Sequence, residues 1–135
     1  MNNIQKAFTG VVILMIGLVI FYFQKRSSLL ANPEFTTGRY LNYYKGVKTG
    51  GGLEFSYSVN GIEYKEICCQ HLPTKCENGL MANQVALRQY TFPVVYDVTD
   101  PSNAELLVVK SQYERFKIEI PDSIAEIISI ISICE

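Results

Sequence analysis

The sequence predicts a mainly β protein: an N-terminal transmembrane helix, then a small antiparallel β barrel or sandwich, then a short C-terminal amphipathic helix. Three observations support this. Residues 7–23 form an uncharged apolar run, residues 53–64 alternate around an Asn-Gly pair, and the final isoleucines recur at helical spacing. We expect an anchor over residues 1–26, a linker over 27–35, a β domain over 36–110 and a C-terminal extension over 111–135.

The apolar run from Ala7 to Phe23 predicts a membrane-spanning helix. Its 17 residues would cover about 25 Å of helix, and the stems of Lys6 and Lys25 can extend that span. A cleaved signal peptide would need a shorter apolar region and a small-x-small cleavage site, whereas Lys25 and Arg26 follow this run directly. We therefore expect one uncleaved span. The basic residues on its two flanks nearly balance, so they leave open the side that the domain occupies.

The segment "LEFSYSVNGIEYKEIC" predicts a β-hairpin. Apolar and polar side chains alternate along its first half, which is typical of a half-buried strand. Asn60-Gly61 favours a two-residue type I′ turn, and this turn sets the register of the two strands. The register places Ile62 and Tyr64 on the apolar face, Cys68 on the same inner face, and Cys69 on the other.

Further strands are expected over residues 36–48, 92–96 and 105–109, with a turn at "DVTDPSN". The segment 80–92 fits either a short helix or an irregular strand. Near the end of the chain, Ile124, Ile127, Ile128 and Ile131 follow helical spacing and predict an amphipathic helix of about twelve residues. Such a helix is too short to cross a bilayer. The domain, a partner and the membrane surface all remain possible surfaces for it.

The stretches "TTGRYLNYY", "FSYSVNGIEYK" and "FPVVYDVTDPSNAELLV" resemble a family of uncharacterised membrane-anchored proteins of Bacteroidetes-type bacteria. The resemblance covers residues 36–123, and the Asn60-Gly61 hairpin and the segment 94–107 are its most specific parts. It implies a small β domain of unknown function beside the bacterial inner membrane. It implies no activity, and the cysteine-rich segment is not part of the family's pattern.

The segment "EICCQHLPTKCENG" holds three of the four cysteines and the single histidine. Cys68, His71 and Cys76 are weak candidates for a zinc site, because a structural zinc normally takes four ligands. We predict a disulfide between Cys69 and Cys76. The main alternative is that the cysteines of this loop are free thiols. A redox enzyme would normally show a Cys-x-x-Cys motif opening a helix, which this segment lacks.

The formal net charge of −1 argues against a nucleic-acid-binding protein. The motifs predict no catalytic residue and no cofactor. We therefore expect a non-enzymatic interaction or accessory module that the membrane anchor brings to a protein partner. One alternative is a thiol/disulfide or metal-dependent sensor or enzyme centred on residues 68–76, and another is a barrel that binds a small ligand or a lipid.

Overall fold

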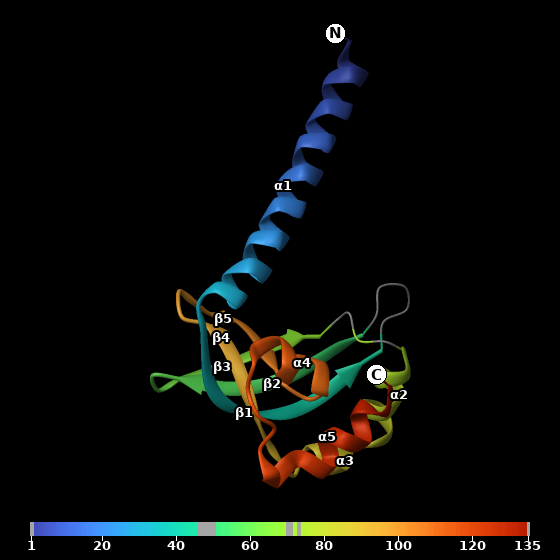
Figure 1. Cartoon of the computed structure of the whole chain (residues 1–135). Coiled ribbons are helices and arrows are strands. Elements are labelled where there is room, and N and C mark those ends of the chain that lie inside the picture. The colour runs from blue at the N-terminus through green and yellow to red at the C-terminus, as the bar shows by residue number, and fades with distance from the viewer. Residues whose placement is uncertain (1, 46–50, 70–71, 73, 135) are drawn as a thin grey trace.

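A computed structural model describes residues 2–45, 51–69, 72 and 74–134 of the chain (Figure 1). A long helix, α1 (Asn3–Ala31), projects from a compact β domain. The strands are β1 (Pro33–Tyr44), β2 (Gly52–Val59), β3 (Ile62–Cys68), β4 (Thr91–Asp97) and β5 (Asp100–Leu106). The helices of the domain are α2 (Thr74–Ala82), α3 (Gln84–Leu87), α4 (Lys110–Phe116) and α5 (Ala125–Ile131), with 3₁₀ turns at Asp122–Ile124 and Ser132–Cys134.

The five strands form one antiparallel sheet in the order β3-β2-β1-β4-β5. The sheet curls until its two edges approach each other, with the sulfur of Cys69 3.8 Å from the carbonyl oxygen of Leu106. The result is a nearly closed barrel with a long apolar helix at its start and a short helix at its end. This architecture confirms the predicted fold class.

The predicted hairpin register is confirmed, with Val59 opposite Ile62 and Leu53 opposite Cys68. Asn60 and Gly61 both have positive φ, at 51° and 79°, as a type I′ turn requires. Ile62 lies opposite Val59, as the predicted apolar face requires, but its side chain is 58% exposed and so is not part of the core. The hairpin tip projects sideways, beyond the helices that cover the barrel (Figure 1).

The predicted linker over residues 27–35 is wrong. Helix α1 continues to Ala31 and β1 begins at Pro33, so a single residue, Asn32, separates the two elements. The helix continues because its last turn packs on the domain, where Leu29 is 7% exposed. In the described residues β1 ends at Tyr44, short of the predicted end at residue 48, and residues 46–50 lie outside the description.

The predicted strand at 92–96 is confirmed as β4, one residue longer at each end. Its partner β5 begins at Asp100, earlier than expected, because Asp97 pairs with Asp100 and the turn shrinks to two residues. Part of "DVTDPSN" is therefore strand.

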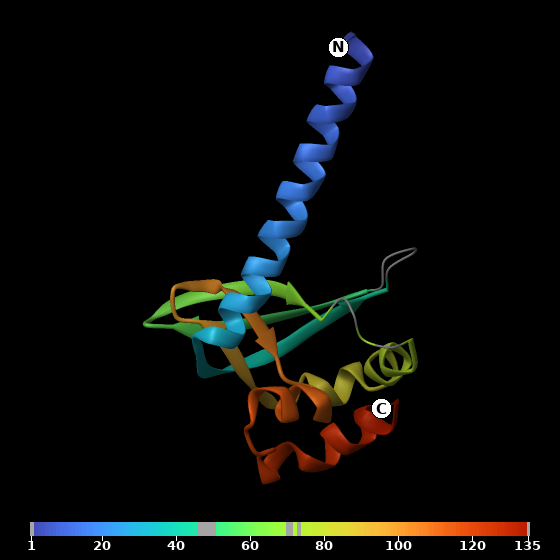
Figure 2. The same ribbon diagram turned by 45° about the horizontal axis from the view of Figure 1, so that its top comes forward.

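The segment 80–92 contains the end of α2 and all of α3, so its first part is helical. The C-terminal extension adds an unpredicted helix, α4, and then α5. Figure 2 shows α2 and α5 together at the end of the barrel remote from α1. All four isoleucines of the predicted apolar face are buried there: Ile124, Ile127, Ile128 and Ile131. The extension therefore belongs to the core of the β domain.

Candidate functional site

The four cysteines form two disulfides. Cys68 is bonded to its neighbour Cys69, and Cys76 is bonded to Cys134, with Cα atoms 5.0 Å apart. The predicted Cys69–Cys76 bridge is therefore wrong.

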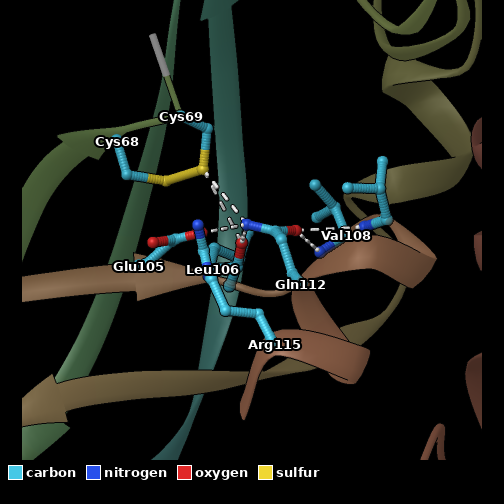
Figure 3. The surroundings of a disulfide bond; sticks show 8 residues. Cys68, Cys69, Glu105, Leu106, Val108, Gln112 and Arg115 are labelled. Atoms are coloured by element: carbon cyan, nitrogen blue, oxygen red, sulfur yellow. Dashed lines mark hydrogen bonds and ion pairs between the residues drawn. A yellow bond between two sulfur atoms is a disulfide. The ribbon is translucent and has the colours of Figure 1, made fainter. Parts of the chain in front are cut away.

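The backbone explains this pairing. Cys68 ends β3 with its side chain buried, as the hairpin register predicts. The alternation of faces holds only inside a strand, and Cys69 follows the strand with a left-handed φ of 64°. A non-glycine residue in this region costs roughly 1–2 kcal/mol of backbone free energy. The reversal brings the Cys69 side chain back beside that of Cys68 (Figure 3).

Cys76 lies in α2, whose neighbours include α5 and the last 3₁₀ turn. The spacing of the C-terminal isoleucines could have indicated that Cys134 is the partner of Cys76. Cys134 is three residues after Ile131 and so continues the apolar face of the C-terminal helix. Assigning Cys134 to that face would have placed it against the domain, where it meets the buried Cys76.

The weak zinc candidates do not form a ligand set in the described residues. Cys68 and Cys76 are each bonded to another sulfur, so neither offers a thiolate to a metal. His71 lies outside the residues that the structure describes. Within the described part of the chain, no group of three His, Cys, Asp or Glu side chains is placed to hold an ion.

Gln112 connects the Cys68–Cys69 disulfide to the first turn of α4 (Figure 3). Its Oε1 accepts hydrogen bonds from the backbone N–H groups of Val108, at 2.7 Å, and Val109, at 3.1 Å. Its Nε2 donates to Glu105 Oε1 at 2.6 Å and to the Leu106 carbonyl at 3.0 Å. The same nitrogen lies 3.5 Å from the sulfur of Cys69. This buried amide therefore ties together β5, α4 and the disulfide.

A cleft of about 510 Å³ opens beside this disulfide. Its walls come from the last three turns of α1, the end of β3 with the residues after it, β5, and α4. Glu105 and Arg115 form an ion pair on one wall, and Lys25 and Arg26 lie on the opposite, helical wall. Its volume is in the range of small-molecule sites. Only the fold brings these elements together, so sequence reasoning missed the cleft.

The helical wall is held by hydrogen bonds to the β4–β5 hairpin. The Ser28 hydroxyl donates to the Asp97 carboxylate, which also accepts from the backbone N–H of Thr99 at 2.8 Å and its hydroxyl at 2.6 Å. Burial raises the pKa of Asp97, but the hydrogen bonds from Ser28 and Thr99 outweigh it and the net shift is downward. The amide of Asn103 donates to the Lys25 carbonyl at 2.8 Å.

A second buried carboxylate, Glu77, lies on α2 at the other end of the domain. It accepts hydrogen bonds from the Tyr43 hydroxyl at 2.6 Å and from the Gly51 N–H at 3.0 Å. These two donors lower the pKa of Glu77, while burial and then the bond to Glu77 raise the pKa of Tyr43. Both donors stabilise the ionised Glu77 carboxylate, and they join α2 to β1 and to the residue just before β2.

The arrangement has two chemical capacities. The cleft presents apolar, cationic and hydrogen-bonding groups together, which suits an amphiphilic ligand. The Cys68–Cys69 bond lines the same cleft and can accept two electrons from a thiol. Comparison with known proteins finds no family model, no curated protein and no solved structure that matches this chain.

Proposed function

We propose that this protein is a single-span, membrane-anchored accessory module of a bacterial inner-membrane complex, in which the β domain contacts a protein partner. The observation that supports this most directly is the surface of α1. The helix is long and apolar enough to cross a membrane, and the apolar part of it has no buried residue. An apolar segment with no buried residue in the described part of the chain needs another apolar environment, which a bilayer supplies.

The junction between α1 and the domain favours a retained anchor over a cleaved signal sequence. Leu29 is part of the hydrophobic core, and Ser28 donates to the buried Asp97. Removing the helix with its last turn would expose core surface and take a donor from a buried carboxylate, which is costly. The helix therefore serves the fold as well as the membrane.

The two disulfides support a position of the domain on the oxidising side of the inner membrane. All four cysteines are paired, and disulfides persist mainly outside reducing compartments. This pairing is stronger evidence than the flanking charges, which differ by about one basic residue.

A membrane-extraction experiment on the full chain tests the anchor. We expect the protein to stay in alkali-washed membranes and to be released by detergent. Replacing Leu14 and Ile16 with lysine should move it to the soluble fraction, because a charge at the bilayer centre costs about 2.5–3.5 kcal/mol per residue. The matched variant Leu14→Ala/Ile16→Ala should remain in the membrane. Release of the unmodified chain by alkali would contradict the anchor.

The partner role has its own test. Ile130 on α5 and Ile133 in the 3₁₀ turn after it are exposed, at 43% and 82%, and they form the contact surface that we propose. A companion protein should co-purify in mild detergent at fixed stoichiometry and be lost from the Ile130→Ser/Ile133→Ser variant. Ile62→Ser, at the exposed hairpin tip, is the matched control and should retain it. A strictly monomeric chain with no stoichiometric companion would contradict the proposal.

A second candidate function, a thiol-responsive sensor, is favoured by the position of the Cys68–Cys69 bond in the cleft wall. One dithiol, or two monothiols, would reduce it to two cysteine thiols and leave the reductant as a disulfide. The nearby Gln112 would then lose its contact with the bonded sulfur.

The sensor idea predicts selective reduction of one bond in the folded protein. Alkylation and mass spectrometry at graded thiol concentrations should label Cys68 and Cys69 while Cys76–Cys134 stays intact. Cys76 is fully buried, whereas the Cys68–Cys69 pair borders the cleft. Simultaneous labelling of all four, at the point where the chain unfolds, would exclude a sensor at this bond.

A further inference from the structure

The cleft beside the Cys68–Cys69 disulfide lies where α1 meets the barrel, which fixes its depth relative to a membrane. The apolar run of α1 ends at Phe23, and the cleft is lined from Tyr22 to Leu30 along the helix. If α1 spans a bilayer, Lys25 and Arg26 lie just outside the hydrocarbon, at the level of the lipid headgroups. The cleft then opens at that same level.

The helical wall has the character of an amphiphile-binding surface. Tyr22, Leu29 and Leu30 give it an apolar side, and Lys25 and Arg26 give it two cations one residue apart in sequence. Within the described part of the chain, no carboxylate lies within ion-pair distance of either cation. Their charges are therefore available to a ligand.

The opposite wall adds hydrogen-bonding groups, with its own charges largely satisfied. Arg115 is paired with Glu105, which also accepts from Gln112. Glu66 is the other acidic residue in the lining, so the cleft keeps an excess of one positive charge once this pair is discounted. Ser102 and Asn103 contribute polar groups at the base of the helix. A cleft with this charge balance favours an anionic ligand.

We propose that this cleft binds the phosphate-bearing headgroup of an anionic phospholipid, with the acyl chains lying along α1 toward the bilayer. The inference rests on the proposed membrane anchor. It also gives a reason for two basic residues after the span when the domain is on the outer side, where the positive-inside rule provides none. Lys25 and Arg26 would contact the phosphate. The neighbouring polar groups of Ser102 and Asn103 would contact the glycerol part of the lipid.

The test compares lipids bound to the full chain in mild detergent. Native mass spectrometry, with phosphatidylglycerol or phosphatidylcholine added in turn, measures how much of each lipid stays bound. We expect retention of one phosphatidylglycerol in preference to phosphatidylcholine. Each basic residue near an anionic lipid contributes roughly fivefold in affinity, so Lys25→Gln/Arg26→Gln should weaken retention about 25-fold.

The matched control is Arg39→Gln/Lys75→Gln, which makes the same change of charge at two exposed positions outside the cleft. It should leave retention unchanged. Equal retention of the two lipids, or an equal loss in the control variant, would overturn the proposal. The proposal would also be overturned if inorganic phosphate bound as tightly as phosphatidylglycerol and displaced it completely, because the cleft would then be a site for the free anion.

The outcomes also separate this inference from the proposed anchor. If the chain leaves alkali-washed membranes, the anchor fails and the lipid site fails with it. If the chain stays in the membrane but shows no preference for phosphatidylglycerol, only the lipid site fails. Circular dichroism of both charge variants checks that each retains the native fold, so that a loss of binding reports on the cleft.

Discussion

Two buried tyrosines show how differently one hydroxyl group can serve the core. Tyr40 and Tyr113 are 1% and 2% exposed. The Tyr113 hydroxyl donates to the carbonyl of Leu107 at 3.0 Å, whereas that of Tyr40 has no hydrogen-bond partner among the described residues. Burial raises the pKa of both, to about 12 for Tyr40, so both are neutral at ordinary pH.

We expect Tyr40→Phe to raise the free energy of unfolding by about 1 kcal/mol, because it removes a buried polar atom that has lost its water. Tyr113→Phe should lower it by a similar amount, since the Leu107 carbonyl loses its donor. Urea denaturation of the full chain in mild detergent measures both. A loss of stability in Tyr40→Phe equal to that in Tyr113→Phe would show that the Tyr40 hydroxyl is hydrogen-bonded.

At the scale of the elements, local patterns predicted the hairpin and the C-terminal helix correctly. Asn60-Gly61 and strict alternation act within a few residues, so β2 and β3 were predictable in register. Helix α4 was missed because its apolar residues are few, although Val109, Tyr113 and Phe116 have the spacing of one helical face. The end of α1 was missed because the contacts that extend it, at Ser28 and Leu29, are with distant strands.

The disulfides join elements of very different separation, and their contributions to stability should differ accordingly. Cys76 and Cys134 are 58 residues apart and link α2 to the C-terminal turn, so their bond restricts the unfolded chain by about 4 kcal/mol. Cys68 and Cys69 are adjacent, and the same relation gives only about 1 kcal/mol.

We therefore expect Cys76→Ala/Cys134→Ala to lower the free energy of unfolding by about 4 kcal/mol or more, and Cys68→Ala/Cys69→Ala by much less. Urea denaturation without reductant measures both. Adding a strong thiol should bring the unmodified chain close to the first variant. Equal losses in the two double variants would contradict this account of the bonds.

At the scale of the whole molecule, the cleft illustrates what sequence reasoning could not reach. The sequence pointed to the cysteine segment, but the predicted bridge joined Cys69 to Cys76 because these two residues are close in sequence. The observed partners depend on a reversal of the backbone at Cys69 and on the packing of α2 against α5. The cleft itself needs α1, β3, β5 and α4 in one place, which no local pattern specifies.

The hydrogen bonds at Asp97 make the junction between helix and domain sensitive to acid. Its pKa is lowered in the fold relative to about 3.9 in an unfolded chain. The ionised carboxylate therefore stabilises the folded protein above about pH 4, and this contribution is lost as pH falls through the lower, folded pKa.

We expect Asp97→Asn to be less stable than the unmodified chain at neutral pH, and the two to converge as the pH falls below about 4. Urea midpoints measured at a series of pH values test this. Proteolysis near residues 27–32 should also become faster in the variant, because Ser28 loses its charged acceptor. A difference in midpoint that is constant over the whole pH range would show that the charge of Asp97 is not what stabilises the junction.

Because a single residue, Asn32, separates α1 from β1, we expect the helix and the barrel to move together as one rigid unit. Helix α5 lies at the end of the domain remote from α1 (Figure 2), so a rotation of α1 would be carried through the barrel to α5. A helix longer than the local hydrocarbon thickness responds by tilting. If α1 spans a bilayer as we propose, a thinner membrane would tilt the helix and swing the far end of the domain sideways, so that membrane thickness would set the position of the proposed contact surface.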